Sequence, residues 1–270
     1  MKENIPVDVL NKTSNKSVSE EVPFEVVPLP SQGLLYDEDH PLYKETTVEI
    51  KAMTAAEEDI LTSPALIKKG TVADELIKAC LINKLIDPET LYPADKDSIL
   101  LAIRISGFGG DYTVKTECPA CEKDFEHTFN LGVCEIKKLE DPKFEFELPK
   151  SKKLVKFKLL TSGEQNEIIK SQTERRKAIK KATGNNVQVE SNVTDRLARQ
   201  IVSLGGETDR SKIASFVRTM PAFDSKALRS HIRKMEPSVN MVQEVSCPHC
   251  DESKLHDIPM GTEFLWPKLD

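Results

Sequence analysis

The sequence predicts an α+β fold, and three observations indicate it. Stretches with the two-residue alternation of strands stand beside amphipathic helical stretches along the 270 residues. Two similar turns, Cys-Pro-Ala-Cys at 118–121 and Cys-Pro-His-Cys at 247–250, each follow a strand-like run. Between them, residues 136–240 have the pattern of a hairpin followed by helices. We therefore expect an N-terminal extended and helical region, a ribbon made of two distant halves, and a hairpin-plus-helices insertion between the halves.

The N-terminal region begins with residues 1–22, which are rich in Asn, Ser, Lys and Glu and lack apolar periodicity. Such a stretch cannot bury enough apolar surface to offset the entropy lost on ordering, so we expect a disordered tail. The proline-rich run 23–36, with its Ser-Gln-Gly turn, predicts extended chain with a sharp bend. Residues 46–51 alternate as a half-buried strand.

Helices are expected next. Thr54 and Glu57 have the spacing of a capping box, which opens a helix over 55–61. The pair Ser63-Pro64 predicts the start of another helix, with Ser63 as its cap and Pro64 in its first turn. A longer amphipathic helix is expected from Thr71.

A further helix is predicted over 95–106, with Gly107 as its end. The glycine-rich run 107–110 is interpreted as a hinge into the first cysteine turn. It is a poor phosphate-binding loop, because it follows a helix and lacks the Lys-Ser/Thr ending.

Within the insertion, the alternating runs 144–148 and 154–160 flank a Pro-Lys-Ser-Lys turn and predict a β-hairpin. Thr161 and Glu164 form a second capping box, which opens a long polar helix to about residue 183. Gly-Asn-Asn at 184–186 is expected to end that helix. Three more helices are predicted, over 194–204, 210–220 and 224–235, with caps near Asp209 and Asp224 for the last two.

The two cysteine turns supply four thiolates, from Cys118, Cys121, Cys247 and Cys250. A proline after the first cysteine gives a tight turn that directs both sulfurs at one ion. Four sulfurs complete the closed tetrahedral set of a structural zinc site. Strand-like sequence on both sides of each turn argues against a thioredoxin-like redox motif. The sequence therefore predicts a split zinc ribbon whose zinc joins two distant parts of the chain.

The remaining candidate ligands have simpler interpretations. His127 and His256 follow the second cysteine of each turn at the same offset, and we interpret them as strand residues near the site rather than as ligands. His249 lies within the second turn, where its ring is expected to face solvent or a partner. Cys80 and Cys134 stand among apolar neighbours and are expected to be buried thiols.

Composition excludes several functional classes. Charged residues make up 30% of the chain and the net charge is −6, so no polyanionic partner is demanded. The N-terminus lacks the features of a signal peptide, and no apolar run approaches the roughly 18 residues that a membrane span needs. No nucleophile elbow, Ser/His/Asp arrangement or phosphate loop is present. We expect a cytosolic, non-enzymatic protein without a small-molecule substrate.

One segment departs from the acidic balance of the chain. Residues 150–185 carry eleven basic residues against three acidic ones, a net charge of +8. Nucleic acid or an acidic protein surface could bind this segment. A merely solvated face is the simpler interpretation, because aromatic side chains for base stacking are nearly absent from the helix. The basic residues are Lys150, Lys152, Lys153, Lys156, Lys158, Lys170, Arg175, Arg176, Lys177, Lys180 and Lys181.

With these motifs placed, the chain resembles the baseplate hub assembly protein family of T-even-like contractile-tailed phages. The resemblance covers residues 23–135 and, more loosely, the second cysteine turn. It rests on Leu-Pro-Ser-Gln-Gly-Leu-Leu-Tyr at 29–36, Met-Thr-Ala-Ala-Glu-Glu-Asp-Ile-Leu at 53–61, Ile-Lys-Lys-Gly at 67–70, Leu-Ala-Ile-Arg-Ile-Ser-Gly at 101–107, the first cysteine turn, and Phe-Leu-Trp-Pro at 264–267.

Members of that family are non-enzymatic proteins of tail morphogenesis. The resemblance therefore implies a baseplate hub assembly factor, chaperone or hub component, with hub or tail subunits as partners. It places the protein in the host cytoplasm during assembly or in the virion baseplate. The alternative function is a zinc-ribbon nucleic-acid-binding protein that uses the basic segment 150–181. Candidate partner-binding residues are Glu57, Glu58 and Asp59, where the resemblance is densest, and Arg175, Arg176 and Lys177 in the basic segment.

These expectations divide the chain into five parts. Residues 1–22 form a tail, 23–107 a strand and helical region, and 108–135 the first ribbon half. Residues 136–240 form the inserted arm, and 241–270 the second ribbon half with a C-terminal tail.

Overall fold

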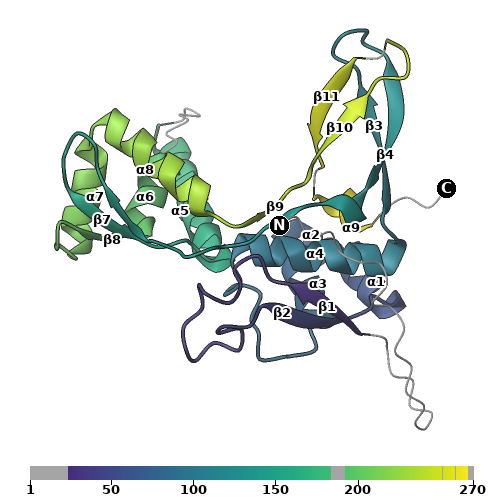
Figure 1. The fold of residues 1–270 in the computed structure, drawn as a ribbon, viewed down its shortest axis with the longest axis horizontal. Helices are drawn as coiled ribbons and strands as arrows, with labels where there is room; N and C mark the ends of the chain where they lie inside the picture. The colour runs from purple at the N-terminus through teal and green to yellow at the C-terminus, as the bar shows by residue number, and fades with distance from the viewer. Residues whose placement is uncertain (1–23, 184–191, 251, 259, 267–270) are drawn as a thin grey trace. The chain divides into compact units, whose positions relative to one another are not determined.

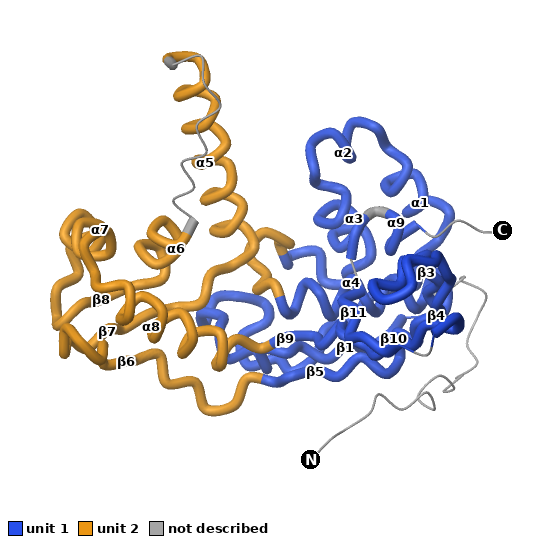
Figure 2. Tube along the Cα trace, turned by 90° about the horizontal axis from the view of Figure 1, so that it is seen from above, with its two compact units in different colours: residues 1–86, 94–138, 238–270 blue, residues 87–93, 139–237 orange. Residues whose placement is uncertain are grey.

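A computed structural model describes residues 24–183, 192–250, 252–258 and 260–266. The predicted tail, 1–22, and the predicted helix end, 184–186, lie outside the described residues. The chain divides into two compact units, coloured separately in Figure 2: unit 1 comprises 1–86, 94–138 and 238–270, and unit 2 comprises 87–93 and 139–237. Helices and small antiparallel sheets make up the fold, which confirms the predicted α+β class.

Unit 1 begins with a two-stranded antiparallel sheet followed by helices (Figure 1). Val27, Val48 and Ile50 alternate with exposed positions along its strands and are buried. The elements are β1 (Phe24–Pro28), β2 (Thr47–Lys51), α1 (Ala55–Thr62), α2 (Pro64–Lys69), α3 (Val72–Cys80) and α4 (Pro93–Phe108). The predicted helix starts after Thr54, Ser63 and Thr71 are confirmed.

Helix α4 is central to unit 1 and buries polar side chains among its apolar ones. The Asp95 carboxylate accepts hydrogen bonds from the Ser31 backbone amide at 2.8 Å and from the Tyr36 hydroxyl at 2.7 Å. The Ser98 hydroxyl donates to the Pro28 carbonyl at 2.8 Å. Because these groups are buried, each needs such a partner, and together they fix the loop 29–36 on the helix.

The predicted end of this helix at Gly107 is wrong. Gly107 lies inside α4 beside Met53, where a Cβ would come within 2.3 Å of the Met53 Cε atom. The chain leaves the helix at Gly109 instead, whose φ of +81° favours glycine. Close packing therefore explains the first glycine, and backbone conformation explains the second.

Two β-hairpins of unit 1 carry the cysteine turns at their tips. Strand β3 (Asp111–Glu117) pairs with β4 (Asp124–Asn130), and β10 (Val242–Ser246) pairs with β11 (Ser253–Asp257). Figure 1 shows the hairpins side by side. Lys254 donates to the Glu117 carbonyl and Gln243 to the Asn130 carbonyl, each at 2.9 Å. A short 3₁₀ turn (Leu131–Val133) follows β4, and α9 (Thr262–Leu265) follows β11.

Two short strands stand where the chain leaves unit 1 and returns to it. Strand β5 (Ile136–Lys137) pairs antiparallel with β9 (Ser238–Val239). The Asn240 amide extends this ladder by donating to the Glu135 carbonyl at 2.8 Å. The segment that leads out of unit 1 and the segment that leads back into it are therefore hydrogen-bonded to each other.

Unit 2 contains a three-stranded antiparallel sheet in the order β6-β7-β8, together with helices. Its elements are β6 (Glu145–Glu147), β7 (Leu154–Phe157), α5 (Ser162–Thr183), α6 (Asn192–Gln200), β8 (Ile201–Leu204), α7 (Arg210–Thr219) and α8 (Ala222–Met235). The most deeply buried apolar residues are Leu91, Leu148, Val155, Leu197, Ile201, Ile213 and Leu228. The predicted hairpin of β6 and β7 and the predicted long polar helix α5 are confirmed.

Two predictions within unit 2 are wrong. The helix expected over 194–204 ends at Gln200, and its last four residues form β8, because β-branched Ile201 and Val202 join the edge of β7. Asp224 does not cap its helix, which begins at Ala222. Its buried carboxylate instead accepts from the backbone amides of Lys150 and Ser151, at 2.7 and 2.9 Å. Asp209 does cap α7, as predicted.

Candidate metal centre

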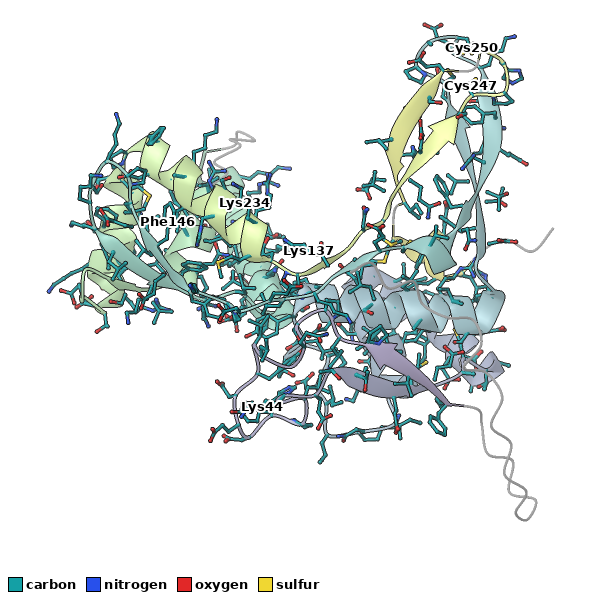
Figure 3. The ribbon with its side chains drawn as sticks, viewed as in Figure 1. Lys44, Lys137, Phe146, Lys234, Cys247 and Cys250 are labelled. Atoms are coloured by element: carbon teal, nitrogen blue, oxygen red, sulfur yellow. The ribbon has the colours of Figure 1, made fainter. Side chains whose placement is uncertain are left out.

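The four predicted cysteines come together at the tips of the two hairpins; Figure 3 labels Cys247 and Cys250 there. All four sulfur atoms lie within 4.8 Å of one another, and all four cysteines are free thiols. The Cys118 and Cys250 sulfurs are 3.6 Å apart, and those of Cys121 and Cys247 are 3.8 Å apart. Both of these contacts run between the two hairpins.

Each turn is closed by backbone hydrogen bonds that aim its sulfurs at the other hairpin. The Cys118 amide donates to the Lys123 carbonyl at 3.1 Å, and the Glu122 amide donates back to the Cys118 carbonyl at 2.9 Å. In the second turn, the Cys247 amide donates to the Glu252 carbonyl at 2.8 Å. The antiparallel strands below therefore determine where both turns lie.

The sulfur spacing fits a tetrahedral thiolate site. A tetrahedron with metal–sulfur bonds of about 2.3 Å places its sulfurs about 3.8 Å apart, and the two distances between the hairpins are 3.6 and 3.8 Å. Cys118 and Cys247 are buried, whereas Cys250 is exposed. Four sulfurs fill every position of such a site and leave none for a reacting water. The arrangement can hold a metal ion and has the features of a structural centre.

The electrostatics of the cluster also favour a cation. The backbone amides of Cys121 and Ala120 lower the pKa of the Cys118 thiol to about 7. The backbone of Glu252 lowers the pKa of Cys250, but desolvation and the three neighbouring sulfurs together raise it to about 12. One sulfur ionises readily and its neighbours then resist ionisation, because like charges at this spacing repel. A divalent cation would remove that repulsion.

The histidines near the site are strand residues, as predicted. His127 lies in β4 and His256 in β11, and neither contributes to the sulfur cluster. Both rings contact Phe129, one edge-on at 4.7 Å and the other stacked at 5.6 Å between centroids. Only the stacked contact between His256 of β11 and Phe129 of β4 joins the two hairpins, since His127 and Phe129 belong to the same strand. His249 is exposed in the second turn.

The two remaining cysteines are buried thiols. Burial raises the pKa of Cys80 to about 11, and it also raises the pKa of Cys134. The Cys134 sulfur accepts from the Gln243 side-chain amide at 3.7 Å. Neither residue belongs to the cluster at the hairpin tips.

The acidic run at the start of α1 is divided between the interior and the surface. Glu57 is buried, and its carboxylate accepts from Lys51 at 2.6 Å and from the Thr54 hydroxyl and amide at 2.6 and 3.0 Å. Burial alone would raise the pKa of Glu57, but these bonds lower it to about 2. Glu58 is half-buried and Asp59 is exposed.

The basic candidates lie on α5, in the other unit. Arg175, Arg176 and Lys177 are all exposed on this helix. The Arg175 guanidinium pairs with Asp195 of α6 at 3.3 Å. The two predicted groups of partner-binding residues therefore belong to different units.

Sequence reasoning missed one residue that supports the ribbon. Arg104 of α4 is buried and donates to the carbonyls of Gly109 at 2.8 Å and of Asp111 at 3.1 Å. It thus fixes the start of β3 on the helix. The available signal was a guanidinium between Ile103 and Ile105 in the run 99–105, which is otherwise apolar, because a charged group in that position needs fixed partners.

Comparison with known proteins identifies a protein family. The sequence model of a protein family described as T4 bacteriophage base plate protein matches residues 34–266. The match spans most of the chain, both cysteine turns included. No curated protein and no solved structure matches the chain. Among the described residues, no helix has the length and apolar character needed to cross a membrane.

Proposed function

This chain belongs to the T4 bacteriophage base plate protein family, and from that premise we propose that it is a non-enzymatic baseplate hub assembly factor or hub component. It acts by contacts with other hub or tail subunits, as an assembly factor in the host cytoplasm or as a component of the virion baseplate. The observation that carries the proposal is the family match, because it covers both units and both cysteine turns. A role in assembly also agrees with the closed sulfur cluster, which leaves no position for catalysis.

The metal in this proposal is zinc, with a structural role. Cys118, Cys121, Cys247 and Cys250 would hold it, and a redox-inert ion with tetrahedral preference suits four thiolates. The chemistry it supplies is cross-linking of two hairpins that are distant in sequence. The chain's own residues direct the sulfurs and pack the strands below them.

The insertion 136–240, most of which lies in unit 2, is the proposed recognition arm, and the ribbon is its anchor. This arm contains the segment of +8 net charge in a chain whose net charge is −6. Beyond its first turn, α5 buries no side chain among the described residues, so its long basic surface is open to a partner. Such a surface would accelerate encounter with an acidic subunit more than it would add affinity.

The start of α1 is proposed as a second contact region. Glu58 and Asp59 are the candidates, since the Glu57 carboxylate is bonded within the fold. Their simplest role is to stabilise the N-terminus of α1 through its dipole, worth about 0.3–1 kcal/mol each. The proposal adds a contact with a hub subunit.

Nucleic-acid binding by the basic segment is the competing function. It would show as an affinity for DNA or RNA that falls steeply with salt, because bound phosphates release counterions. The absence of aromatic residues from α5 disfavours it, since single strands are usually held by stacking.

Infected cells provide the test. A tagged copy of the protein should co-purify with defined hub or tail subunits, and mass spectrometry of assembly intermediates beside finished virions should show at which stage it is present. Phage lacking the protein should accumulate incomplete baseplates. Normal tails in its absence would overturn the proposal.

A further inference from the structure

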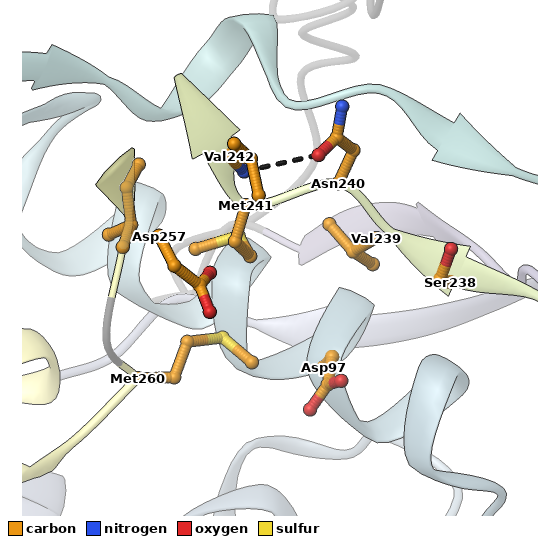
Figure 4. A pocket seen from close by; sticks show the side chains of 9 residues that line it. Asp97, Ser238, Val239, Asn240, Met241, Val242, Asp257 and Met260 are labelled. Carbon is orange, nitrogen blue, oxygen red and sulfur yellow. Dashed lines mark hydrogen bonds between the residues drawn. The ribbon is translucent and has the colours of Figure 1, made fainter. Parts of the chain in front are cut away.

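We propose that unit 1 contains a docking pocket for a basic, partly apolar segment of another baseplate protein. This inference rests on the proposed function, for which it supplies a third contact and the chemistry of the partner. The pocket has a volume of about 440 Å³ (Figure 4). Its lining comes from α4, from the segment leading from β9 into β10, and from the end of β11: Asp97, Ser238, Val239, Asn240, Met241, Val242, Asp257, Ile258 and Met260.

Two carboxylates line different sides of this pocket. Asp97 comes from α4 and Asp257 from the end of β11. In the part of the chain that the structure describes, neither carboxylate receives a hydrogen bond or an ion pair. Lys96, the lysine next to Asp97 in the sequence, pairs with Asp74 instead.

The Asp97 charge is costly where it stands. Burial raises the pKa of Asp97 to about 6, although Lys96 acts in the opposite direction. A cationic group in the pocket would be attracted to the partly buried carboxylate of Asp97, where water screens the attraction less than in bulk, and also to the exposed carboxylate of Asp257.

The other walls of the pocket suit the stem of a lysine or arginine. Val239, Met241, Ile258 and Met260 contribute apolar surface. Long basic side chains lay their methylene groups along apolar surface and present the charge at the end. Methionine adapts to such a stem, because its side chain is unbranched and flexible.

A surface of mixed acidic and apolar side chains continues from the pocket along the second hairpin. Val242 faces Asp257 across the β10–β11 ladder, and Glu244 faces Leu255. These four positions share one face of the hairpin, since side chains two residues apart point the same way. Leu255 is 75% exposed and Val242 41% exposed. Acidic and apolar groups therefore alternate on this face, and its complement is a segment in which basic and apolar side chains alternate.

The charge of unit 1 as a whole favours the same partner. Its sequence has 17 Lys and Arg against 29 Asp and Glu, a net charge of −12, whereas unit 2 has 21 against 15, a net charge of +6. A field of this sign accelerates the approach of a basic partner and slows that of an acidic one. Unit 1 is thus expected to recognise a basic surface, and α5 of unit 2 an acidic one.

The first test uses a labelled peptide in which lysine and leucine alternate. A glutamate–leucine peptide of equal length is the control. Fluorescence anisotropy with the full chain should show binding of the lysine peptide alone. The double variant Asp97→Asn, Asp257→Asn should weaken binding at least tenfold, and Leu255→Ser should weaken it by a smaller factor. The matched control, Asp124→Asn with Glu126→Gln, removes two exposed charges from the first hairpin and should leave binding unchanged.

Equal losses in the control and the pocket variants would show general charge attraction and overturn the proposal, as would equal binding of both peptides. In extracts of infected cells, carbodiimide coupling should join Asp97 or Asp257 to a lysine of an identified tail subunit. Coupling to a second copy of this chain instead would refute a hetero-partner. If the pocket variants still assemble tails while phage lacking the protein does not, the pocket proposal fails and the proposed function stands.

Discussion

The carboxylate of Asp224 accepts a hydrogen bond from the backbone amide of Lys150 at 2.7 Å, although 74 residues separate them. It also accepts from the amide of Ser151 at 2.9 Å and from that residue's hydroxyl. A side chain in the first turn of α8 thus holds the turn between β6 and β7. This long-range contact therefore connects α8 to the β6–β7 hairpin within unit 2.

Replacing Asp224 by Ala should destabilise unit 2 by about 2–4 kcal/mol, because two backbone amides lose a charged acceptor in a largely buried site. Hydrogen exchange at the Lys150 and Ser151 amides should accelerate accordingly. Asp209→Ala removes a cap that is exposed and should cost only about 1 kcal/mol. Equal effects of the two substitutions would contradict the structural account.

Purified protein is expected to contain one zinc per chain, and Cys118→Ser or Cys247→Ser should abolish it, because metal binding and ordering of the turns are one equilibrium. Elemental analysis measures the metal, and near-ultraviolet circular dichroism follows the aromatic contacts around Phe129. Cys80→Ser serves as the control and should retain full metal content. Absence of zinc, or a disulfide in freshly prepared native protein, would refute this prediction.

Glu57 should make unit 1 sensitive to acid. Its pKa in the folded state is about 2, below its ordinary value of 4.5, so the ionised carboxylate stabilises the fold above pH 4.5. That contribution is lost as the pH falls from 4.5 toward 2. Glu57→Gln should lower stability by about 1–3 kcal/mol at neutral pH and flatten the acid dependence of the melting temperature. A variant with an unchanged acid profile would exclude this role.

The proposed contact at α1 predicts a separation of stability from assembly. The double variant Glu58→Ala, Asp59→Ala should lose no more than about 2 kcal/mol, the sum of two dipole contributions, yet it should reduce complementation of a phage lacking the protein. If both thermal stability and tail assembly are untouched, the contact is absent.

Charge reversal on α5 should slow association with an acidic partner at low salt and weaken its salt dependence. Arg175, Arg176 and Lys177 are the predicted contacts, but reversing Arg175 would also break its pair with Asp195. Lys177, Lys180 and Lys181 changed to Glu form a cleaner set. Zinc content and melting temperature should be unaffected, and an association rate equal to the native one would mean that this face is only solvated.

Local sequence signals predicted the elements whose stabilising partners are local. The capping residues Thr54 and Thr161 mark helix starts correctly, since their partners lie three residues away. The clustering of the four cysteines was equally predictable, because spacing and residue type together define a set of thiolate ligands. Family membership was also accessible from the short motifs around the loop 29–36 and the start of α1.

Features made by distant partners were not predictable. Strand β8 has a helical neighbour on one side, and only its pairing with β7 makes it a strand. Asp224 has the spacing of a helix cap, but its acceptor oxygens are used by a turn far away in sequence. Asp97 and Asp257 share a pocket, yet neither stands in a motif.

The separation of the two hairpins along the chain also sets an order of events during synthesis. Cys118 and Cys250 are 132 residues apart, and every residue of unit 2 lies between them or before them. A ribosome adding about 5–20 residues per second therefore completes unit 2 before it supplies the last strands of unit 1. The four cysteines can therefore come together only after the ribosome has synthesised the whole recognition arm.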